Sequence, residues 1–340
     1  MNYIIFGGSG FVGTHLAKVI RESGKDCKIY SLDILKPGEP IPNISHYRTA
    51  LCEGEAYVSE YIPCDVRKPI EVTFEPTPDD VIFNLAAVHR TPGHEDVEYF
   101  ETNIRGAENV CAFADRYGIK RIVFTSSIAP YGAAEELKFE STLPTPNTPY
   151  GISKLVAEKI HMVWKAKSSD RQLVILRPGV VFGKGENGNF TRLYWGVRKR
   201  TFAYPGRKDT IKACVYVKEL VRFMLWRLDN YKDNGTPESD IYNCTFEPAY
   251  TIEQIVETIK SVTGLTHWVP YVPNSVILPS SAIAKACGSP MGICPERVKK
   301  LQISTDISGK KFVNSGYTFN WTLEEAIADW FADNQGKCLE

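Results

Sequence analysis

The chain of 340 residues has no surplus of charge of either sign, because 40 Lys and Arg balance 40 Asp and Glu. It therefore lacks the overall basic field with which proteins attract nucleic acids or anionic membranes, and an anionic substrate must be held by local cations. No apolar run approaches the roughly 20 residues of a membrane-spanning helix, and no signal peptide is recognisable. We therefore expect a cytoplasmic protein that binds neither nucleic acid nor membrane.

The nine cysteines are odd in number and contain no CxxC pair. Cys287 and Cys294 are the closest two, and no histidine lies near them. This pattern favours neither a zinc site nor a disulfide framework, so we expect no metal and reduced thiols.

Short β-branched runs alternate with amphipathic helical patterns through the first half of the chain. We predict strands at 3–6, 28–32, 81–84, 121–125 and 173–176, and helices at 11–23, 97–117 and 149–167. Such alternation is typical of a parallel sheet with helices on both faces. In the less regular second half we expect helices at 190–199, 251–262 and 322–330, the last opened by a capping box of Thr322 and Glu325. Residues 274–295, broken by Pro and Gly, predict an irregular segment.

Three glycines, Gly7-x-x-Gly10-x-x-Gly13, follow the first predicted strand and open the first helix through Phe11 and Val12. Glycine permits the tight turn and the close approach of a pyrophosphate, and the helix N-terminus offers free N–H groups to the phosphates. The position of the motif between strand and helix favours a dinucleotide site. The alternative is a glycine-rich turn that binds no ligand.

Asp33 ends the second strand, where a carboxylate accepts hydrogen bonds from the adenosine ribose. It would repel a 2′-phosphate by about 4 kcal/mol at a separation of about 4 Å. We therefore predict NAD rather than NADP, unless Lys36 compensates. These features define the fold class as α/β: a Rossmann doubly wound parallel sheet with a smaller C-terminal α+β substrate lobe. We expect residues 1–182 to form the NAD-binding domain, with 213–245 returning to it, and 183–212 and 246–335 to form the lobe.

Tyr150 and Lys154 stand one helical turn apart, behind Thr148 and Pro149 as cap and first helical residue. A neighbouring ammonium lowers the pKa of a phenol and makes it a better general base. Ser126 and Ser127 follow the strand at 121–125, at the sheet edge where α/β proteins bind ligands. Tyr-x-x-x-Lys pairs are common by chance, but the order of glycine loop, Asp33, serines and Tyr150 favours a catalytic site.

Six segments in this order and spacing carry a family resemblance: GGSGFVG, PCDVRK, NLAAVHR, FTSSIAPYG, YGISK and RPGVVFG. They resemble the extended short-chain dehydrogenases, and within these the sugar-nucleotide epimerases and dehydratases typified by UDP-galactose 4-epimerase. The resemblance covers most of the first 185 residues. It implies NAD as cofactor, Ser127 as catalytic hydroxyl, Tyr150 as base and Lys154 as its electrostatic partner. It also implies further contacts to the cofactor from Asp65, Val66, Asn84, Ala86, Ala87, His89, Asn103, Ser126 and Pro178. His89 is equally interpretable as a proton or substrate contact and as a residue with only a hydrogen-bonding role.

On the substrate side, the stretch around Asn189, Phe190 and 202–217 resembles the family's nucleotide-binding segment. It implies substrate contacts from Asn189, Phe190, Tyr204 and Lys212, with Ser127 and His89 at the sugar. Lys212 stands where the family usually has an arginine for the diphosphate. Arg297 would add a second cation, unless it is a solvated arginine beside Lys299 and Lys300. Two departures bear on the reaction: Val180 replaces an asparagine frequent in 4-epimerases, and Ile128–Ala129 replaces the Asp-Glu pair of the 4,6-dehydratases.

Three functions remain open. The first is NAD-dependent C4 epimerisation of a nucleotide sugar, a UDP-sugar being favoured, through a transient 4-keto intermediate. The second is a reductase or dehydrogenase of a keto-sugar nucleotide or another carbonyl compound, which would use the same residues with exchangeable NAD(P). The third is a cofactor-binding protein without turnover, which would have no need of a tyrosine base. The resemblance also implies a homodimer formed through the helices at 97–117 and 149–167.

Overall fold

A seven-stranded parallel sheet forms the centre of the protein, seen here in a computed structural model that describes residues 1–39, 56–89, 94–132, 134–232, 240–277, 279, 298 and 302–340. Every strand pairing in the sheet is parallel. In spatial order the strands are β12 (Ile241–Cys244), β7 (Gln172–Pro178), β5 (Arg121–Thr125), β4 (Val81–Asn84), β1 (Tyr3–Phe6), β2 (Ile29–Asp33) and β3 (Glu60–Pro63).

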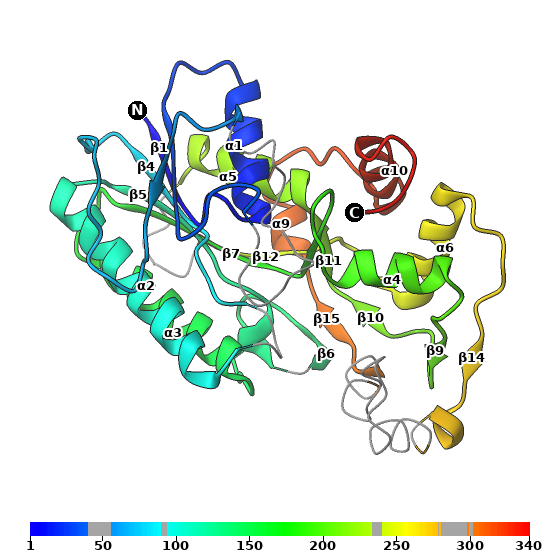
Figure 1. Cartoon of the computed structure of the whole chain (residues 1–340). Coiled ribbons are helices and arrows are strands. Elements are labelled where there is room, and N and C mark those ends of the chain that lie inside the picture. Colours follow the sequence, from blue (N-terminus) through cyan, green and yellow to red (C-terminus); the bar gives the residue numbers. More distant parts are fainter. Residues whose placement is uncertain are drawn as a thin grey trace.

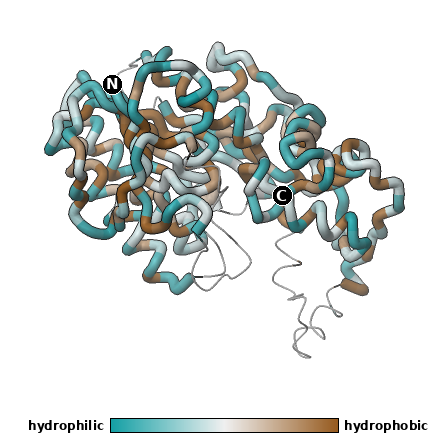
Figure 2. Tube along the Cα trace, turned by 45° about the horizontal axis from the view of Figure 1, so that its top comes forward, coloured by the Kyte–Doolittle hydropathy of each residue, from teal (hydrophilic) through white to brown (hydrophobic). Residues whose placement is uncertain are grey.

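Helices cover both faces of this sheet (Figure 1). Successive strand residues point to opposite faces, so Ile5 joins one hydrophobic core and Ile4 the other. The first core holds α1 (Phe11–Glu22) and α5 (Val217–Asp229), and the second holds α2 (Asp96–Tyr117) and α3 (Pro149–Ala166). Figure 2 shows the corresponding hydrophobic segments running through the interior of the layers. Because both faces are covered, the central strands are continuously buried.

The order of the strands reverses between β1 and β4, since the chain passes from β1 outward to β2 and β3 and then returns to β4 on the other side. In doubly wound sheets the ligand crevice lies at the carboxyl ends of the strands at such a point. The predicted Rossmann α/β fold is thus confirmed. The five predicted strands and the helices named above agree with the structure to within a few residues.

Two strands of the sheet, β3 and β12, were not predicted. The edge strand β3 reads Glu-Tyr-Ile-Pro and buries only Ile62, so its sequence lacks the continuous apolar run of a central strand. The buried strand β12 contains Asn243 in place of an aliphatic residue. In both cases the pairing with a neighbouring strand, rather than local pattern, produces the strand.

A second sheet has the mixed order β13 (Tyr250–Thr251), β10 (Ile211–Lys212), β15 (Thr305–Ile307), β6 (Ala134–Lys138). Beside it lie α4 (Asn189–Arg198), α6 (Ile252–Thr263) and the strand pair β9 (Tyr204–Pro205) and β14 (Tyr271–Val272) (Figure 1). The last long helix, α10 (Leu323–Asp333), packs on α6 and begins with the predicted capping box of Thr322 and Glu325. Most of the irregular segment expected at 274–295 lies outside the described residues.

The remaining described elements connect these layers. They are the 3₁₀ turn η2 (Ala129–Tyr131) after β5, the parallel pair β8 (Val180–Phe182) and β11 (Cys214–Tyr216), and the short helix α9 (Lys310–Val313). The turn η2 packs against α3, and α9 packs against β12.

Candidate active site

The glycine loop leaves β1 and enters α1 with a geometry that only glycine accommodates. Gly7 has φ 78°, and a Cβ placed on it would lie 2.7 Å from the backbone nitrogen of Ala86. A Cβ on Gly13 would lie 2.5 Å from the carbonyl oxygen of Gly7. Gly10 is the N-cap of α1 and has no side chain that could accept hydrogen bonds from the first turn of the helix. The N–H groups of that turn are therefore suited to phosphate oxygens. This cradle fits the pyrophosphate of a dinucleotide.

Asp33 lies across the same loop, at the carboxyl end of β2. Its Oδ2 accepts a hydrogen bond from the backbone N–H of Ser9 (3.1 Å), and its Oδ1 accepts one from Ile34 N–H (2.7 Å). Burial raises the pKa of Asp33, and the hydrogen bonds from backbone N–H groups oppose this. The structure thus brings the predicted ribose acceptor and the glycine loop together at one end of the sheet.

The segments after β3 and β4 complete this edge. Arg67 donates to both carboxylate oxygens of Asp65, which lowers the pKa of that carboxyl. The side chain of Val66 is buried beneath Gly106 of α2. The Nδ2 of Asn84 lies 3.2 Å from His161 Nε2 in the α3 layer, and its contact with the cofactor stays a prediction.

Asn103 connects the loop after β4 to the catalytic helix. Its side chain accepts a hydrogen bond from Val88 N–H (3.0 Å) and donates to Val88 O (3.1 Å) and to Ser153 Oγ (2.9 Å). Since Ser153 lies beside Lys154 in α3, Asn103 holds two parts of the site together. Ala87, close to this bridge, is half-buried, whereas His89 is exposed.

Ser127 and Tyr150 meet at the carboxyl end of β5. A hydrogen bond from Ser127 lowers the pKa of the Tyr150 phenol, while burial, the larger effect, raises it. Ala129 N–H donates to Ser127 Oγ at 3.1 Å and fixes the hydroxyl in the turn before η2. Pro178, at the end of β7, accepts a hydrogen bond from Ile128 N–H (3.2 Å). The serine loop, α3 and β7 therefore converge at one place.

Lys154 does not act on Tyr150 in the way that the sequence suggested. Its Nζ lies 4.3 Å from the ring centroid of Phe124. The expected lowering of the Tyr150 pKa is therefore wrong for this geometry. Burial of the phenol is the largest effect, and it raises the pKa of Tyr150. Lys154 itself is 2% exposed. Burial lowers its pKa to about 7, against the opposing attraction of Glu158.

Two residues expected at the substrate are core residues. The ring of Phe190 stacks on Phe182 with centroids 4.4 Å apart. Tyr204 is 1% exposed and packs with Val197 and other members of a small apolar cluster. Both side chains pack in apolar clusters, and their contact with a substrate stays a prediction. The sequence could not distinguish them from ligand-binding aromatics, since aromatic residues serve both purposes.

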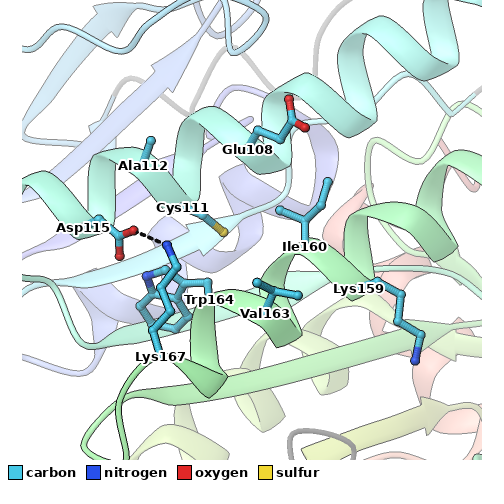
Figure 3. Close-up of a pocket in the computed structure, with 9 residues that line it drawn as sticks. All are labelled: Glu108, Cys111, Ala112, Asp115, Lys159, Ile160, Val163, Trp164 and Lys167. Carbon is cyan, nitrogen blue, oxygen red and sulfur yellow. Dashed lines mark hydrogen bonds and ion pairs between the residues drawn. The ribbon is translucent and has the colours of Figure 1, made fainter.

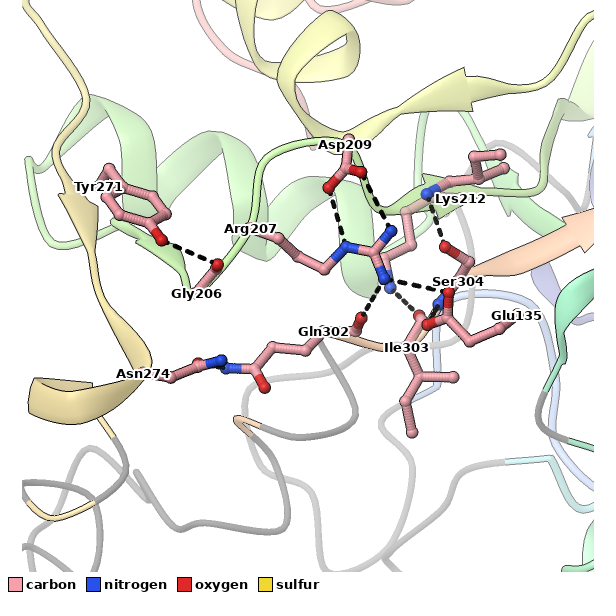
Figure 4. Close-up of polar contacts among 11 residues, drawn as sticks. Glu135, Gly206, Arg207, Asp209, Lys212, Tyr271, Asn274, Gln302, Ile303 and Ser304 are labelled. Atoms are coloured by element: carbon pink, nitrogen blue, oxygen red, sulfur yellow. Dashed lines mark hydrogen bonds and ion pairs between the residues drawn. The ribbon is translucent and has the colours of Figure 1, made fainter.

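Of the other predicted substrate contacts, Asn189 is exposed and Lys212 is half-buried. Asn189 begins α4 and accepts a hydrogen bond from Arg192. Lys212 donates from Nζ to the carbonyl oxygen of Ile303 at 2.7 Å, as Figure 4 shows. Arg297 lies outside the described residues.

A second cation, Arg207, lies near Lys212 and was not predicted from the sequence. Its guanidinium makes a two-pronged contact with Asp209 and bonds Glu135 at 3.0 Å (Figure 4). These carboxylates raise the pKa of Arg207. Glu135 also accepts from Ser304 N–H (2.8 Å), so the arginine joins β6 to the segment before β15. The spacing of Arg207 and Asp209, two residues apart, could have indicated this ion pair in the sequence.

A buried ionic network beneath the serine loop was also missed. It consists of Glu158, Arg177, Tyr131 and Ser126, which come from α3, β7, η2 and the end of β5. Glu158 stands four residues after Lys154, on the same helix face, and Arg177 immediately precedes Pro178. The positions of Glu158 and Arg177 beside predicted site residues could have indicated a polar network there.

Within the described part of the chain, no cluster of three or more His, Cys, Asp or Glu side chains is arranged to hold a metal ion. In the same part, every helix is too short or too polar to cross a bilayer.

The fold and the site define a dinucleotide-binding protein with a Ser-Tyr-Lys constellation at the sheet edge. A model of the NAD dependent epimerase/dehydratase family matches residues 3–245. The chain belongs to this family, and its cofactor is NAD.

The chain is similar to several characterised proteins. It is 27% identical over 333 residues to the N-acetyl-alpha-D-glucosaminyl-diphospho-ditrans,octacis-undecaprenol 4-epimerase of Escherichia coli O157:H7, covering 96% of this chain and 93% of the relative. It is 25% identical over 287 residues to a UDP-glucose 4-epimerase of Streptococcus mutans, covering 78% and 82%. The UDP-glucose 4-epimerase of Thermus thermophilus in complex with NAD has a similar fold, with a TM-score of 0.70, 20% identity and coverage of 99% and 100%.

Proposed function

We propose that this protein is an NAD-dependent sugar-nucleotide epimerase that inverts C4 of a UDP-sugar through a transient 4-keto intermediate. The observation that carries the proposal is the contact between Ser127 and Tyr150 at the end of β5, on the sheet edge that also holds the glycine cradle and Asp33. The family and the 4-epimerase relatives support the reaction class. Ile128 and Ala129, in place of an acidic pair, disfavour dehydration.

In this mechanism Tyr150 is the acid and base. In its deprotonated form, which burial opposes and the hydrogen bond from Ser127 favours, Tyr150 takes the proton of the C4 hydroxyl and later returns one to the keto oxygen. Ser127 orients that hydroxyl. NAD, held by the glycine cradle and Asp33, would supply the reversible hydride acceptor that oxidation and reduction at C4 require. Lys154 reaches the same region from the next turn of α3 and would hold the nicotinamide ribose. No net oxidation results, so the cofactor is not consumed.

The first test is to release the bound dinucleotide by denaturation, identify it, and then incubate the native enzyme with a panel of nucleotide sugars without added cofactor. Stoichiometric NAD and an isomerised sugar support the epimerase. Turnover that depends on added NAD(P)H would instead establish the reductase. Tyr150→Phe should lower kcat by about 100- to 10,000-fold, the usual contribution of a general base. The matched control Tyr117→Phe, at the far end of α2, should keep wild-type kcat. Unchanged biological function of Tyr150→Phe would support a protein that binds NAD without turnover.

A second candidate is 4-epimerisation of a sugar carried on a polyprenyl diphosphate. The Escherichia coli relative that acts on such a substrate aligns with 96% of this chain, including the region beyond the family match. Two aromatic residues next to the predicted nucleotide-binding segment are exposed: Trp268 (74%) and Tyr271 (44%). Tyr271 lies on β14 and donates from its hydroxyl to Gly206 O, beside Arg207 (Figure 4). Exposed aromatic side chains beside the segment that we propose for diphosphate recognition suit an isoprenoid chain.

To separate the two candidates, the enzyme is given UDP-N-acetylglucosamine and, in detergent, N-acetylglucosaminyl-diphospho-undecaprenol. Conversion of the lipid-linked sugar alone would establish the second candidate, and conversion of the nucleotide sugar alone the first. Trp268→Ser should raise KM for the lipid-linked sugar by about tenfold, since one aromatic ring loses its buried contact. Leu143→Ser, at an equally exposed position (78%) elsewhere, is the control.

We also propose a homodimer that pairs α2 and α3 of two copies. Four apolar side chains on these helices are exposed: Val97 (51%), Ile152 (39%), Val156 (37%) and Val163 (63%). Between the helices lies a groove of about 400 Å³ lined by Ile160, Val163, Glu108 and Ala112 among others, which Figure 3 shows. Exposed apolar stripes of this kind mark association surfaces.

Light scattering tests the dimer. Val163→Glu should give a monomer, because it places a charge in the proposed interface, whereas Leu143→Glu should leave the mass unchanged. A wild-type monomer would contradict the proposal. Two further proposals accompany it: a substrate lobe formed by 183–212 and 246–335, and a cytoplasmic location, the latter testable by cell fractionation.

A further inference from the structure

Glu158 lies at the centre of a buried polar network that joins three parts of the catalytic site. Its side chain is fully buried, and Arg177 is 3% exposed. Glu158 Oε1 accepts from Arg177 Nε (2.8 Å) and Oε2 accepts from Arg177 Nη2 (2.6 Å), a two-pronged contact. Glu158 Oε1 also accepts from Ser126 Oγ at 2.5 Å. The carboxylate is therefore fully engaged.

The network extends further from the arginine. Arg177 Nη1 donates to the Tyr131 hydroxyl (2.7 Å), which in turn donates to Asn243 Oδ1 (2.9 Å). It thus runs from α3 through β7 and η2 to β12. All of its side chains are buried, and a fully satisfied network at low dielectric permits one geometry only.

Each of its three anchors adjoins a residue of the proposed reaction. Ser126 precedes Ser127, Glu158 follows Lys154 by one turn of α3, and Arg177 precedes Pro178. We infer that Glu158 is a positioning residue that fixes the Ser127 loop, the Tyr150–Lys154 helix and the end of β7 relative to one another. This role deepens the proposed function and rests on it.

Net stability is a poor explanation for this arrangement. The desolvation of two charges offsets most of their attraction, so well-packed apolar residues at the same places commonly stabilise a protein as much or more. Positional precision is a better explanation, because a displacement of about 1 Å in a catalytic group can lower the rate by about a hundredfold. In addition, Glu158 is the acidic group that favours the protonated form of Lys154, whose pKa burial lowers.

The test uses Ser126→Ala in the full-length protein, because it removes one link and leaves the ion pair intact. We expect kcat to fall by about ten- to a hundredfold, with KM for the sugar nearly unchanged, and Ser126→Thr, which keeps a hydroxyl, to restore most of the rate. The matched control is Ser168→Ala. Ser168 Oγ donates to the Asp170 carboxylate at 2.6 Å, but on the surface beyond α3. This control should have wild-type kcat.

Amide hydrogen exchange of the peptide spanning residues 121–131 gives a readout that needs no substrate. Exchange there should become faster in Ser126→Ala and in Glu158→Gln, and stay at the wild-type rate in Ser168→Ala. Wild-type kcat together with wild-type exchange in Ser126→Ala would overturn the inference. If the wild-type protein converts no sugar, the proposed function fails, and the exchange data alone then decide the inference: faster exchange supports it and unchanged exchange refutes it.

Discussion

Exchange of Lys154 for methionine should stabilise the protein against unfolding at neutral pH, although it removes a predicted catalytic residue. Lys154 is 2% exposed, and burial lowers its pKa from 10.5 to about 7. Keeping the proton on this buried amine therefore costs about 5 kcal/mol of native-state free energy relative to the unfolded chain. Methionine fills a similar volume without a charge.

The pH dependence follows from proton linkage. Below pH 7 both the native and the unfolded lysine are protonated, so the full cost is present. Between pH 7 and 10.5 the unfolded chain holds a proton that the native protein lacks, so the wild type gains stability as the pH rises through this window. The advantage of Lys154→Met should therefore be largest below pH 7 and shrink by about 1.4 kcal/mol per pH unit above it.

Urea unfolding of both proteins, freed of NAD, at about pH 6, 7.5 and 9 measures this advantage. Taking the difference between wild type and variant at each pH cancels the titration of all other groups. Lys159→Met, at an exposed position of the same helix, should show no such dependence on pH. A difference for Lys154→Met that is constant with pH, or that grows as the pH rises, would refute the reasoning.

Three shorter predictions concern the cofactor edge and the core. Gly7→Ala should abolish NAD retention, because a Cβ there meets backbone at 2.7 Å, whereas Gly24→Ala, with φ 67° and open space, should retain NAD; dinucleotide released on denaturation measures both. Asp33→Asn should raise the affinity for NADP relative to NAD by up to about a thousandfold. If fluorescence titrations give the variant the same ratio of NADP to NAD affinity as the wild type, this prediction is wrong. Arg177→Met should cost about 3–5 kcal/mol of unfolding free energy, and Glu158→Leu with Arg177→Met should recover much of it in urea titrations.

The cofactor half of the protein could be predicted because its determinants are local. A continuous buried run predicts a central strand, and Gly7, Gly10 and Gly13 in sequence fix the turn that follows it. Asp33 is placed by the end of the next strand, and parallel strands end at a common edge. The order of these motifs along the chain therefore fixed their arrangement in space.

The substrate half could not be predicted to the same extent. Phe190 and Tyr204 were expected at the ligand, and both side chains lie in apolar cores. The residues around them in the sequence do not indicate this burial. Arg207 and Glu135, which lie 72 positions apart in the chain, meet only because β6 joins the sheet that contains β10 and β15. Contacts of such separation depend on the packing of whole elements.

The sequence by itself determined the α/β class, the NAD cradle and the presence of Ser127, Tyr150 and Lys154, because hydrophobic period, glycine spacing and motif order are local properties. Only the tertiary structure decided the electrostatics of the site. Burial raises the pKa of Tyr150 and lowers that of Lys154, and the neighbouring Ser127 and Glu158 oppose these shifts. Burial and the pairing of Glu158 with Arg177 arise when α3 packs on β5 and β7, since the cost of removing a charge from water depends on everything that surrounds it.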